Sequence, residues 1–183
     1  DKFDFDNLED GHFIKGFSLL EFKDLVYAIQ NYSLPEELAN SHSFRENFYK
    51  MGFFVVKHID EIQESEGLIK AKELFKKGKD LPEIFRLCLD TIEKVPSDYN
   101  AWNLLGRSLS LQGYDLLAVP CFVQAIMNDP DSNVLAKTNL AISFRNLGYI
   151  ELSNGIALSV ILEADDSTWE FVQSIAVLDI SYR

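Results

Sequence analysis

Cysteine, histidine and basic residues are scarce in this chain of 183 residues. It holds 2 cysteines and 3 histidines, and 17 Lys and Arg face 29 Asp and Glu, which gives a net charge of -12. Cys88 and Cys121 both stand in apolar segments, where a free cysteine is typically a small buried side chain. Because no CxxC pair or cysteine-dense framework is present, the sequence indicates a reducing compartment, and we expect a cytoplasmic protein.

The shortage of positive charge and of imidazole also narrows the possible functions. Nucleic acids and anionic membranes attract positive surfaces, so we expect neither as a partner. No apolar run approaches the roughly 20 residues that a membrane span needs. Neither a GxxxxGK phosphate loop nor a GxSxG elbow occurs, and no histidine has a zinc-ligand spacing. We therefore expect a soluble protein that is not an enzyme and has neither metal nor cofactor.

The most informative pattern lies between Asn100 and Pro130. Large, small and turn-forming residues follow one another in a fixed order: Trp102, Leu105, Gly106, Leu109, Gly113, Tyr114, Ala118, Phe122, Ala125 and Pro130. This order resembles the tetratricopeptide repeat, a pair of antiparallel helices. Gly106 and Ala118 are small enough for the two helices to approach closely, while larger residues fill the space around them. The turn is expected at Gly113.

Two further copies flank this repeat. The downstream copy is carried by Leu140, Ala141, Phe144, Gly148, Ser153, Ala157 and Val160, and it departs from the pattern at Lys137 and Asp165. The upstream copy is carried by Leu68, Ala71, Phe75, Gly78, Cys88 and Thr91, with its second helix starting near Asp80. The resemblance implies an all-α fold, a right-handed solenoid of about three helix pairs at 65–98, 99–132 and 134–167.

The segments outside these repeats are also expected to be helical. Residues 1–64 have an acidic start and would form a helical cap or arm, with one amphipathic helix over Leu19–Ile29 and another from a capping box at Ser43 to about Glu61. The run from Gly52 to Val56 is also compatible with a buried strand. Phe44, Phe48 and Met51 are candidates for a homodimer contact.

After the repeats, Ser167 would open a C-terminal capping helix over 168–183. Its apolar side chains Phe171, Val172, Ile175 and Leu178 would pack on the last repeat. Within the middle repeat, Pro120 conflicts with a helix interior. If the second helix begins near Leu116, this proline falls at the end of the first turn, and we expect a mild kink.

The candidate binding site is a stripe on the first helix of each pair, which lines the concave groove in the resembling family. Its residues mix cations, amides and apolar side chains: Lys76, Asn100, Asn103, Arg107, Ser110, Thr138, Ile142 and Arg145. The Arg side chains would bind a carboxylate or a carbonyl, and Asn103 would form hydrogen bonds with a peptide backbone through its amide. The alternative is that Arg107 and Arg145 merely pair with neighbouring acids on a solvated surface.

These features predict a non-catalytic protein-interaction module that binds a peptide or helix of a partner protein in the groove. One alternative is a chaperone, because a small acidic chain with such repeats is similar to the translocator chaperones of bacterial type III secretion. Another alternative is a docking or regulatory domain of a longer enzyme.

Overall fold

The computed structural model describes residues 27, 31–32, 34, 36–49, 64–129 and 134–181. Within these ranges the protein is all-helical, as predicted, and has no strand. The helices are α2 (Glu36–Asn40), α3 (His42–Tyr49), α4 (Glu66–Lys76), α5 (Leu81–Lys94), α6 (Tyr99–Ser110), α7 (Asp115–Asn128), α8 (Val134–Asn146), α9 (Ile150–Glu163) and α10 (Trp169–Ser181). The amphipathic helix expected over Leu19–Ile29 and the choice between helix and strand at 52–56 lie outside the described residues.

Local sequence signals explain where several helices begin. Ser65, Asp80 and Asp98 accept hydrogen bonds from backbone N–H groups in the first turns of α4, α5 and α6, which satisfies donors that the helix itself leaves unpaired. The predicted start at Asp80 is thus confirmed. Two predicted caps are wrong by one or two positions.

Those two caps belong to α3 and α10. The hydroxyl of Ser41, not Ser43, accepts from the backbone N–H of Phe44 at 3.2 Å. At α10 the hydroxyl of Thr168 accepts from the N–H of Phe171 at 3.4 Å, while Ser167 is bonded to Asp165. Ser41 and Thr168 directly precede the first residues of α3 and α10, the position from which a hydroxyl accepts from the first turn.

Three glycines mark the turns inside successive helix pairs. Gly78, Gly113 and Gly148 have backbone φ angles of 62°, 80° and 86°, a left-handed conformation that favours glycine because it has no Cβ. They follow α4, α6 and α8 and stand at equal intervals along the chain. The turns that the repeat pattern predicted at these glycines are confirmed.

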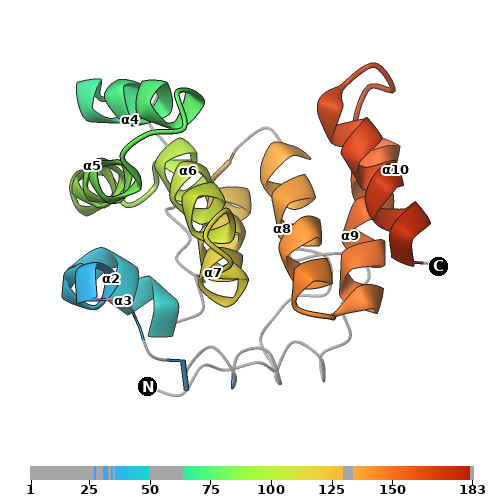
Figure 1. Ribbon diagram of the computed structural model, residues 1–183, viewed down its shortest axis with the longest axis horizontal. Helices are drawn as coiled ribbons and strands as arrows, with labels where there is room; N and C mark the ends of the chain where they lie inside the picture. The colour runs from blue at the N-terminus through green and yellow to red at the C-terminus, as the bar shows by residue number, and fades with distance from the viewer. Residues whose placement is uncertain are drawn as a thin grey trace.

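The helices pack in sequence order (Figure 1). From α4 to α10 each helix contacts the next one, and contacts also join α4 to α6, α6 to α8 and α8 to α10. The alternate helices α4, α6, α8 and α10 therefore form one row of neighbours. This row is the surface on which the candidate binding residues stand.

Close packing of α6 on α7 has a specific cause at Gly106. A Cβ atom at this position would lie 2.7 Å from Cε1 of Phe122, closer than real Cβ contacts, so only glycine lets the Phe122 ring fill this space. Phe122 and Trp102 are fully buried. The expected role of Gly106 in helix approach is thus confirmed by the geometry.

The two cysteines are buried as predicted. Burial raises the pKa of the Cys88 thiol to about 12 and also raises the pKa of Cys121. Both thiols therefore stay protonated at neutral pH and behave as small apolar side chains.

Pro120 lies inside α7 and not in its first turn, because this helix begins at Asp115. The proline ring has no N–H to donate to the carbonyl of Leu116, yet the helix continues to Asn128. The prediction about its position is wrong, and the predicted kink stays a prediction.

The N-terminal helices α2 and α3 lie beside α5 and α7, with contacts from α3 to both of them. Phe44 is 1% exposed, and its ring centroid lies 6.2 Å from that of Trp102. Phe44 is therefore part of the chain's own core, which contradicts its proposed role in a dimer contact. The Phe48 side chain and Met51 lie outside the described residues.

The C-terminal helix α10 packs on α8 and α9, but with only part of the predicted stripe, to which Leu178 belongs. Val177 and Ser174 are buried and Leu178 packs against the core, whereas Val172 and Ile175 are 54% and 45% exposed. The prediction that Val172 and Ile175 pack on the preceding pair is therefore wrong. The sequence has apolar residues around most of this helix, so periodicity did not identify the packed face.

Candidate functional site

Two adjoining hollows lie along the row formed by α4, α6, α8 and α10. The first has a volume of about 490 Å³ and is lined by Lys72, Phe75, Lys76, Asn100, Asn103, Leu104, Arg107 and Leu135. The second has a volume of about 340 Å³ and is lined by Phe75, Arg107, Ser110, Leu111, Phe122, Asn139, Ile142 and Trp169. They share Phe75 and Arg107, so we treat them as one surface, called the groove below.

Arg107 stands where the two hollows meet. Its guanidinium carbon lies 4.6 Å from the centroid of the Phe75 ring, a cation–π geometry that joins α6 to α4. Partial burial lowers the pKa of Arg107 from its usual value, but an arginine remains charged at neutral pH. The groove therefore has a fixed positive charge at its centre, which lies over an aromatic ring.

The first hollow combines further cations with amides. Lys72 pairs with Glu64, and Lys76 is exposed at the end of α4. Asn103 is mostly buried, and its Oδ1 accepts a hydrogen bond from Nδ2 of Asn139 at 3.2 Å. This bond uses one lone pair of Asn103 Oδ1 and does not involve its Nδ2 donor, which a ligand carbonyl would accept from.

The second hollow is largely apolar, and its lining residue Ser110 is bonded to a buried carboxylate. Asp115 at the start of α7 is buried and accepts hydrogen bonds from Ser110 Oγ at 2.6 Å, Ser143 Oγ at 2.8 Å and Asn146 Nδ2 at 3.1 Å. These bonds join α6, α7 and α8. Ser110 therefore lines the groove but its proton is committed to Asp115, so it positions the helices.

The structure brings together most of the residues that the sequence proposed as a site. Lys76, Asn100 and Asn103 line the first hollow, Ser110 and Ile142 line the second, and Arg107 lines both. Two proposed residues lie elsewhere. Thr138 is fully buried and donates to the carbonyl of Val134 at 2.9 Å, so its placement on the groove surface is wrong. Arg145 is partly exposed but lines neither hollow.

Several lining residues were not predicted from the sequence as site residues. Phe75 had been assigned to the core of the first repeat, and Trp169 to a helix that only caps the last one. Trp169 reaches the second hollow because α10 joins the row of alternate helices next to α8. The equal spacing of α6, α8 and α10 along the chain was the available signal for this placement.

Within the described ranges, no group of His, Cys, Asp and Glu side chains is placed to hold a metal ion. No helix in that part of the chain is both long and apolar enough to span a lipid bilayer.

The fold and the groove define an all-helical protein with a row of first helices that carries a hollowed, partly cationic surface. Comparisons with models of protein families, with curated proteins and with solved structures found no match to this chain.

Proposed function

We propose that this protein is a non-catalytic protein-interaction module that holds a peptide or helix of a partner protein in the groove. The observation that supports this most directly is the joining of the two hollows at Phe75 and Arg107. Together they make one surface whose lining residues come from α4, α6, α7, α8 and α10. A partner segment would lie across α4, α6, α8 and the start of α10.

The architecture in this proposal is a right-handed solenoid of tetratricopeptide-type helix pairs. Three observations support it: the equal intervals between Gly78, Gly113 and Gly148, the contacts between alternate helices, and the tight seat of Phe122 on Gly106. Stacked pairs share one core, so each pair stabilises its neighbours and keeps the groove rigid before a ligand binds.

The chemistry of the groove fits a segment with two different parts. Lys76 and Arg107 favour a carboxylate or backbone carbonyls at the first hollow, against the acidic charge of the whole chain. Leu111, Ile142 and Trp169 favour apolar side chains at the second hollow. A polar anchor and an apolar anchor together would set the direction of the bound segment.

A comparison of partner recovery between matched variants tests this proposal. Partners that co-purify with the chain are identified by mass spectrometry, and their recovery is compared for wild type, Lys76→Ala/Arg107→Ala and the control Arg145→Ala. We expect at least fivefold lower recovery with the groove variant and unchanged recovery with the control, because only the former residues line the groove. Equal recovery with all three proteins would refute the proposal.

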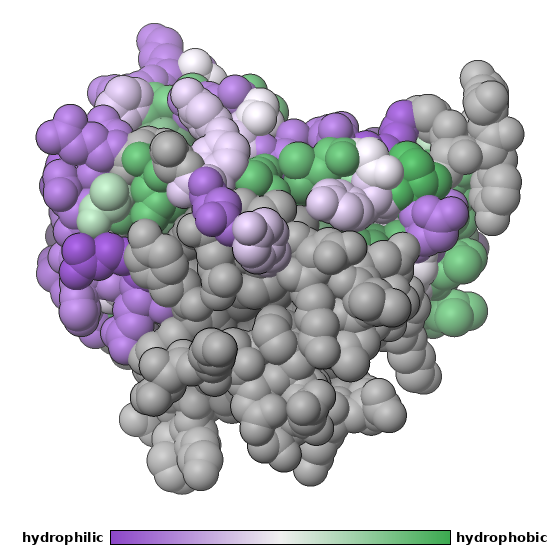
Figure 2. Space-filling model, turned by 90° about the horizontal axis from the view of Figure 1, so that it is seen from below, coloured by the Kyte–Doolittle hydropathy of each residue, from purple (hydrophilic) through white to green (hydrophobic). Residues whose placement is uncertain are grey.

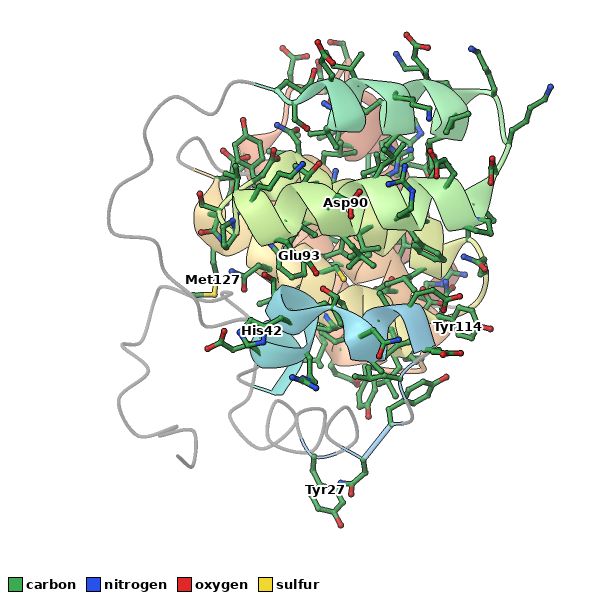
Figure 3. The ribbon with its side chains drawn as sticks, turned by 90° about the vertical axis from the view of Figure 1, so that its left-hand side faces the viewer. Tyr27, His42, Asp90, Glu93, Tyr114 and Met127 are labelled. Atoms are coloured by element: carbon green, nitrogen blue, oxygen red, sulfur yellow. The ribbon has the colours of Figure 1, made fainter. Side chains whose placement is uncertain are left out.

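Site-specific crosslinking locates the partner independently. A photoreactive residue at Leu135 lies in the first hollow, whereas one at Glu93 lies on α5 beside the N-terminal helices (Figure 3). We expect the partner to crosslink to position 135 and not to position 93. Stronger crosslinking at position 93 would contradict binding in the groove and would place the partner beside α2 and α5.

A further inference from the structure

The first hollow of the groove has an excess of positive charge. Its charged lining residues are Lys72, Lys76 and Arg107, and among the described residues no Asp or Glu lines it. The whole chain has the opposite balance, with 29 Asp and Glu against 17 Lys and Arg. In Figure 2 hydrophilic residues gather at the end of the molecule formed by α4 and α5, on the left, and hydrophobic residues at the end formed by α9 and α10. The cations of the groove therefore lie towards its α4 end.

Two of these three cations have no counterion in the part of the chain that the structure describes. Several cations near α4 and α5 form ion pairs, which are Lys70–Glu83, Lys72–Glu64, Lys77–Glu73 and Arg86–Glu83. Lys72 is thus neutralised by Glu64. No described acid lies at ion-pair distance from Lys76 or Arg107. Two positive charges in the first hollow therefore remain uncompensated.

Arg107 is positioned before a ligand binds. The Phe75 ring contacts the face of its guanidinium, with 4.6 Å between the guanidinium carbon and the ring centroid. Its N–H groups donate in the plane of the guanidinium, so this contact does not use them. Partial burial also makes a charge without a counterion unfavourable. An anion that enters the hollow would relieve this cost and would meet a side chain whose conformation is already restricted.

The polar lining of this hollow offers mainly hydrogen-bond donors. The amides of Asn100 and Asn103 lie in the same lining as the cations. Asn103 accepts from Asn139 through Oδ1, so its Nδ2 donor takes no part in that bond. Lysine and arginine are donors only. The complementary ligand group is therefore one with several acceptor oxygens and a negative charge.

A phosphate monoester matches this charge and these donors better than a carboxylate does. A phosphorylated side chain carries a charge of about -1.5 to -2 at pH 7 and three strong acceptor oxygens. A single carboxylate would leave one of the two cations uncompensated. Arginine also binds phosphate through two parallel hydrogen bonds. The volume of about 490 Å³ is within the range of pockets that hold a small ligand group.

We propose that the first hollow binds a phosphorylated serine, threonine or tyrosine side chain of the partner segment, with Arg107 and Lys76 contacting the phosphate. This inference rests on the proposed function, because it names the anionic group of the segment that the groove holds. Neighbouring apolar residues of the segment would enter the second hollow at Ile142 and Trp169. Phosphorylation of the partner would then favour its binding, and dephosphorylation would release it.

Fluorescence anisotropy with mixtures of short labelled peptides tests whether the full chain recognises phosphate. The probe mixture has phosphoserine, phosphothreonine or phosphotyrosine at its centre, randomised flanks and an amidated C-terminus. Matched mixtures have the unphosphorylated residues or glutamate at the centre, and a fourth has glutamate with a free C-terminal carboxylate. We expect the phosphorylated mixture to bind about tenfold more tightly than the others. Inorganic phosphate should compete with it.

Matched variants locate the phosphate. Lys76→Gln and Arg107→Gln should each weaken binding of the phosphorylated mixture about fivefold or more, because each removes one cation of the hollow. Lys79→Gln is the control, since it makes the same change of charge at an exposed position that lines neither hollow. Lys76→Arg should preserve binding. Thermal melts verify folding, and Lys76→Gln alters an exposed side chain, so it gives a result even where Arg107→Gln does not fold.

Phosphatase treatment of co-purified partners separates this proposal from the proposed function. We expect the treatment to lower partner recovery as much as Lys76→Ala/Arg107→Ala does. Loss of partners in that variant with no effect of phosphatase would overturn the phosphate site and leave peptide binding in the groove intact. Unchanged recovery in the variant would refute both proposals.

The peptide measurements can overturn the proposal independently. Equal binding of a glutamate mixture would assign the hollow to carboxylates, and equal binding of the unphosphorylated mixture would show that the anion is unimportant. Competition by inorganic phosphate without any preference among the peptides would assign the hollow to a free anion. Equal losses in Lys76→Gln and Lys79→Gln would show that only the net charge of the chain matters.

Discussion

The helices α6 and α10 occupy equivalent positions, and their environments are opposite. On α6 the residues Trp102, Leu105 and Gly106 are enclosed by the core, and Trp102 Nε1 also donates to the carbonyl of Pro96 at 2.8 Å. On α10 the equivalent Val172 and Ile175 are about half exposed. The comparison shows that one helix register can leave its side chains enclosed or exposed, depending on which helices pack around it.

The largest expected effect compares the same position on both helices. Trp102→Ala should lower the free energy of unfolding by about 3–5 kcal/mol, because it leaves a large cavity beside Phe44 and removes a partly buried hydrogen bond. Val172→Ala should change it by less than about 0.5 kcal/mol, as exposed positions do. Urea unfolding of both variants measures the difference, and similar losses would contradict the equivalence drawn between α6 and α10.

The next effect concerns the carboxylate that ties α6, α7 and α8 together. Asp115→Ala should cost about 3 kcal/mol, since it leaves the polar groups of Ser110, Ser143 and Asn146 without their acceptor. Asp166→Ala, in the exposed turn before α10, is the control and should be nearly neutral. If chemical denaturation finds the two variants equally stable, the Asp115 bonds are unimportant for holding these helices.

A smaller effect tests the close approach of α6 and α7. Gly106→Ala should destabilise the protein by about 1–2 kcal/mol, because the added Cβ would lie 2.7 Å from the buried Phe122 ring. Gly67→Ala on α4 meets nothing closer than 3.7 Å and should stabilise by up to about 1 kcal/mol through helix propensity. Thermal melts of the pair give the sign of each change, and a stabilised Gly106→Ala would mean that the helices have room to separate.

The smallest effect is a pH dependence of stability, which arises at the surface of the helix pair α4 and α5. The helix α10 has no equivalent effect, because it has no Lys, Arg or His. Hydrogen bonds from Arg86 and from Lys70 lower the pKa of Glu83 from 4.5 to about 2. A carboxylate with a lowered folded-state pKa contributes stability above pH 4.5, and this contribution is lost as pH falls towards 2.

Melting temperatures of wild type and Glu83→Gln between pH 7 and pH 2 measure this contribution. The wild type should be slightly more stable at pH 7, and the difference should vanish near pH 2. Glu151→Gln, at an exposed position of α9, is the control. A difference that persists unchanged at pH 2 would show that it does not come from ionised Glu83.

Much of the helical framework could be predicted from local sequence. Gly78, Gly113 and Gly148 predicted the turns because a left-handed backbone strongly favours glycine, and Asp80 predicted a helix start because its carboxylate accepts backbone donors. Six of the eight proposed site residues line the groove, since helical periodicity placed them on one face. The prediction for Thr138 was wrong because helical periodicity does not give the rotation of a helix about its own axis relative to its neighbours.

The sequence by itself determined which segments are helices, where their turns lie and which small residue lets α6 approach α7. These are local properties, governed by backbone conformation and side-chain spacing along one or two helices. Only the tertiary structure decided that Phe44 packs on Trp102, that Trp169 reaches the groove and that Val172 and Ile175 stay exposed. Those outcomes depend on how helices distant in sequence cross and rotate, which is fixed by the shared core.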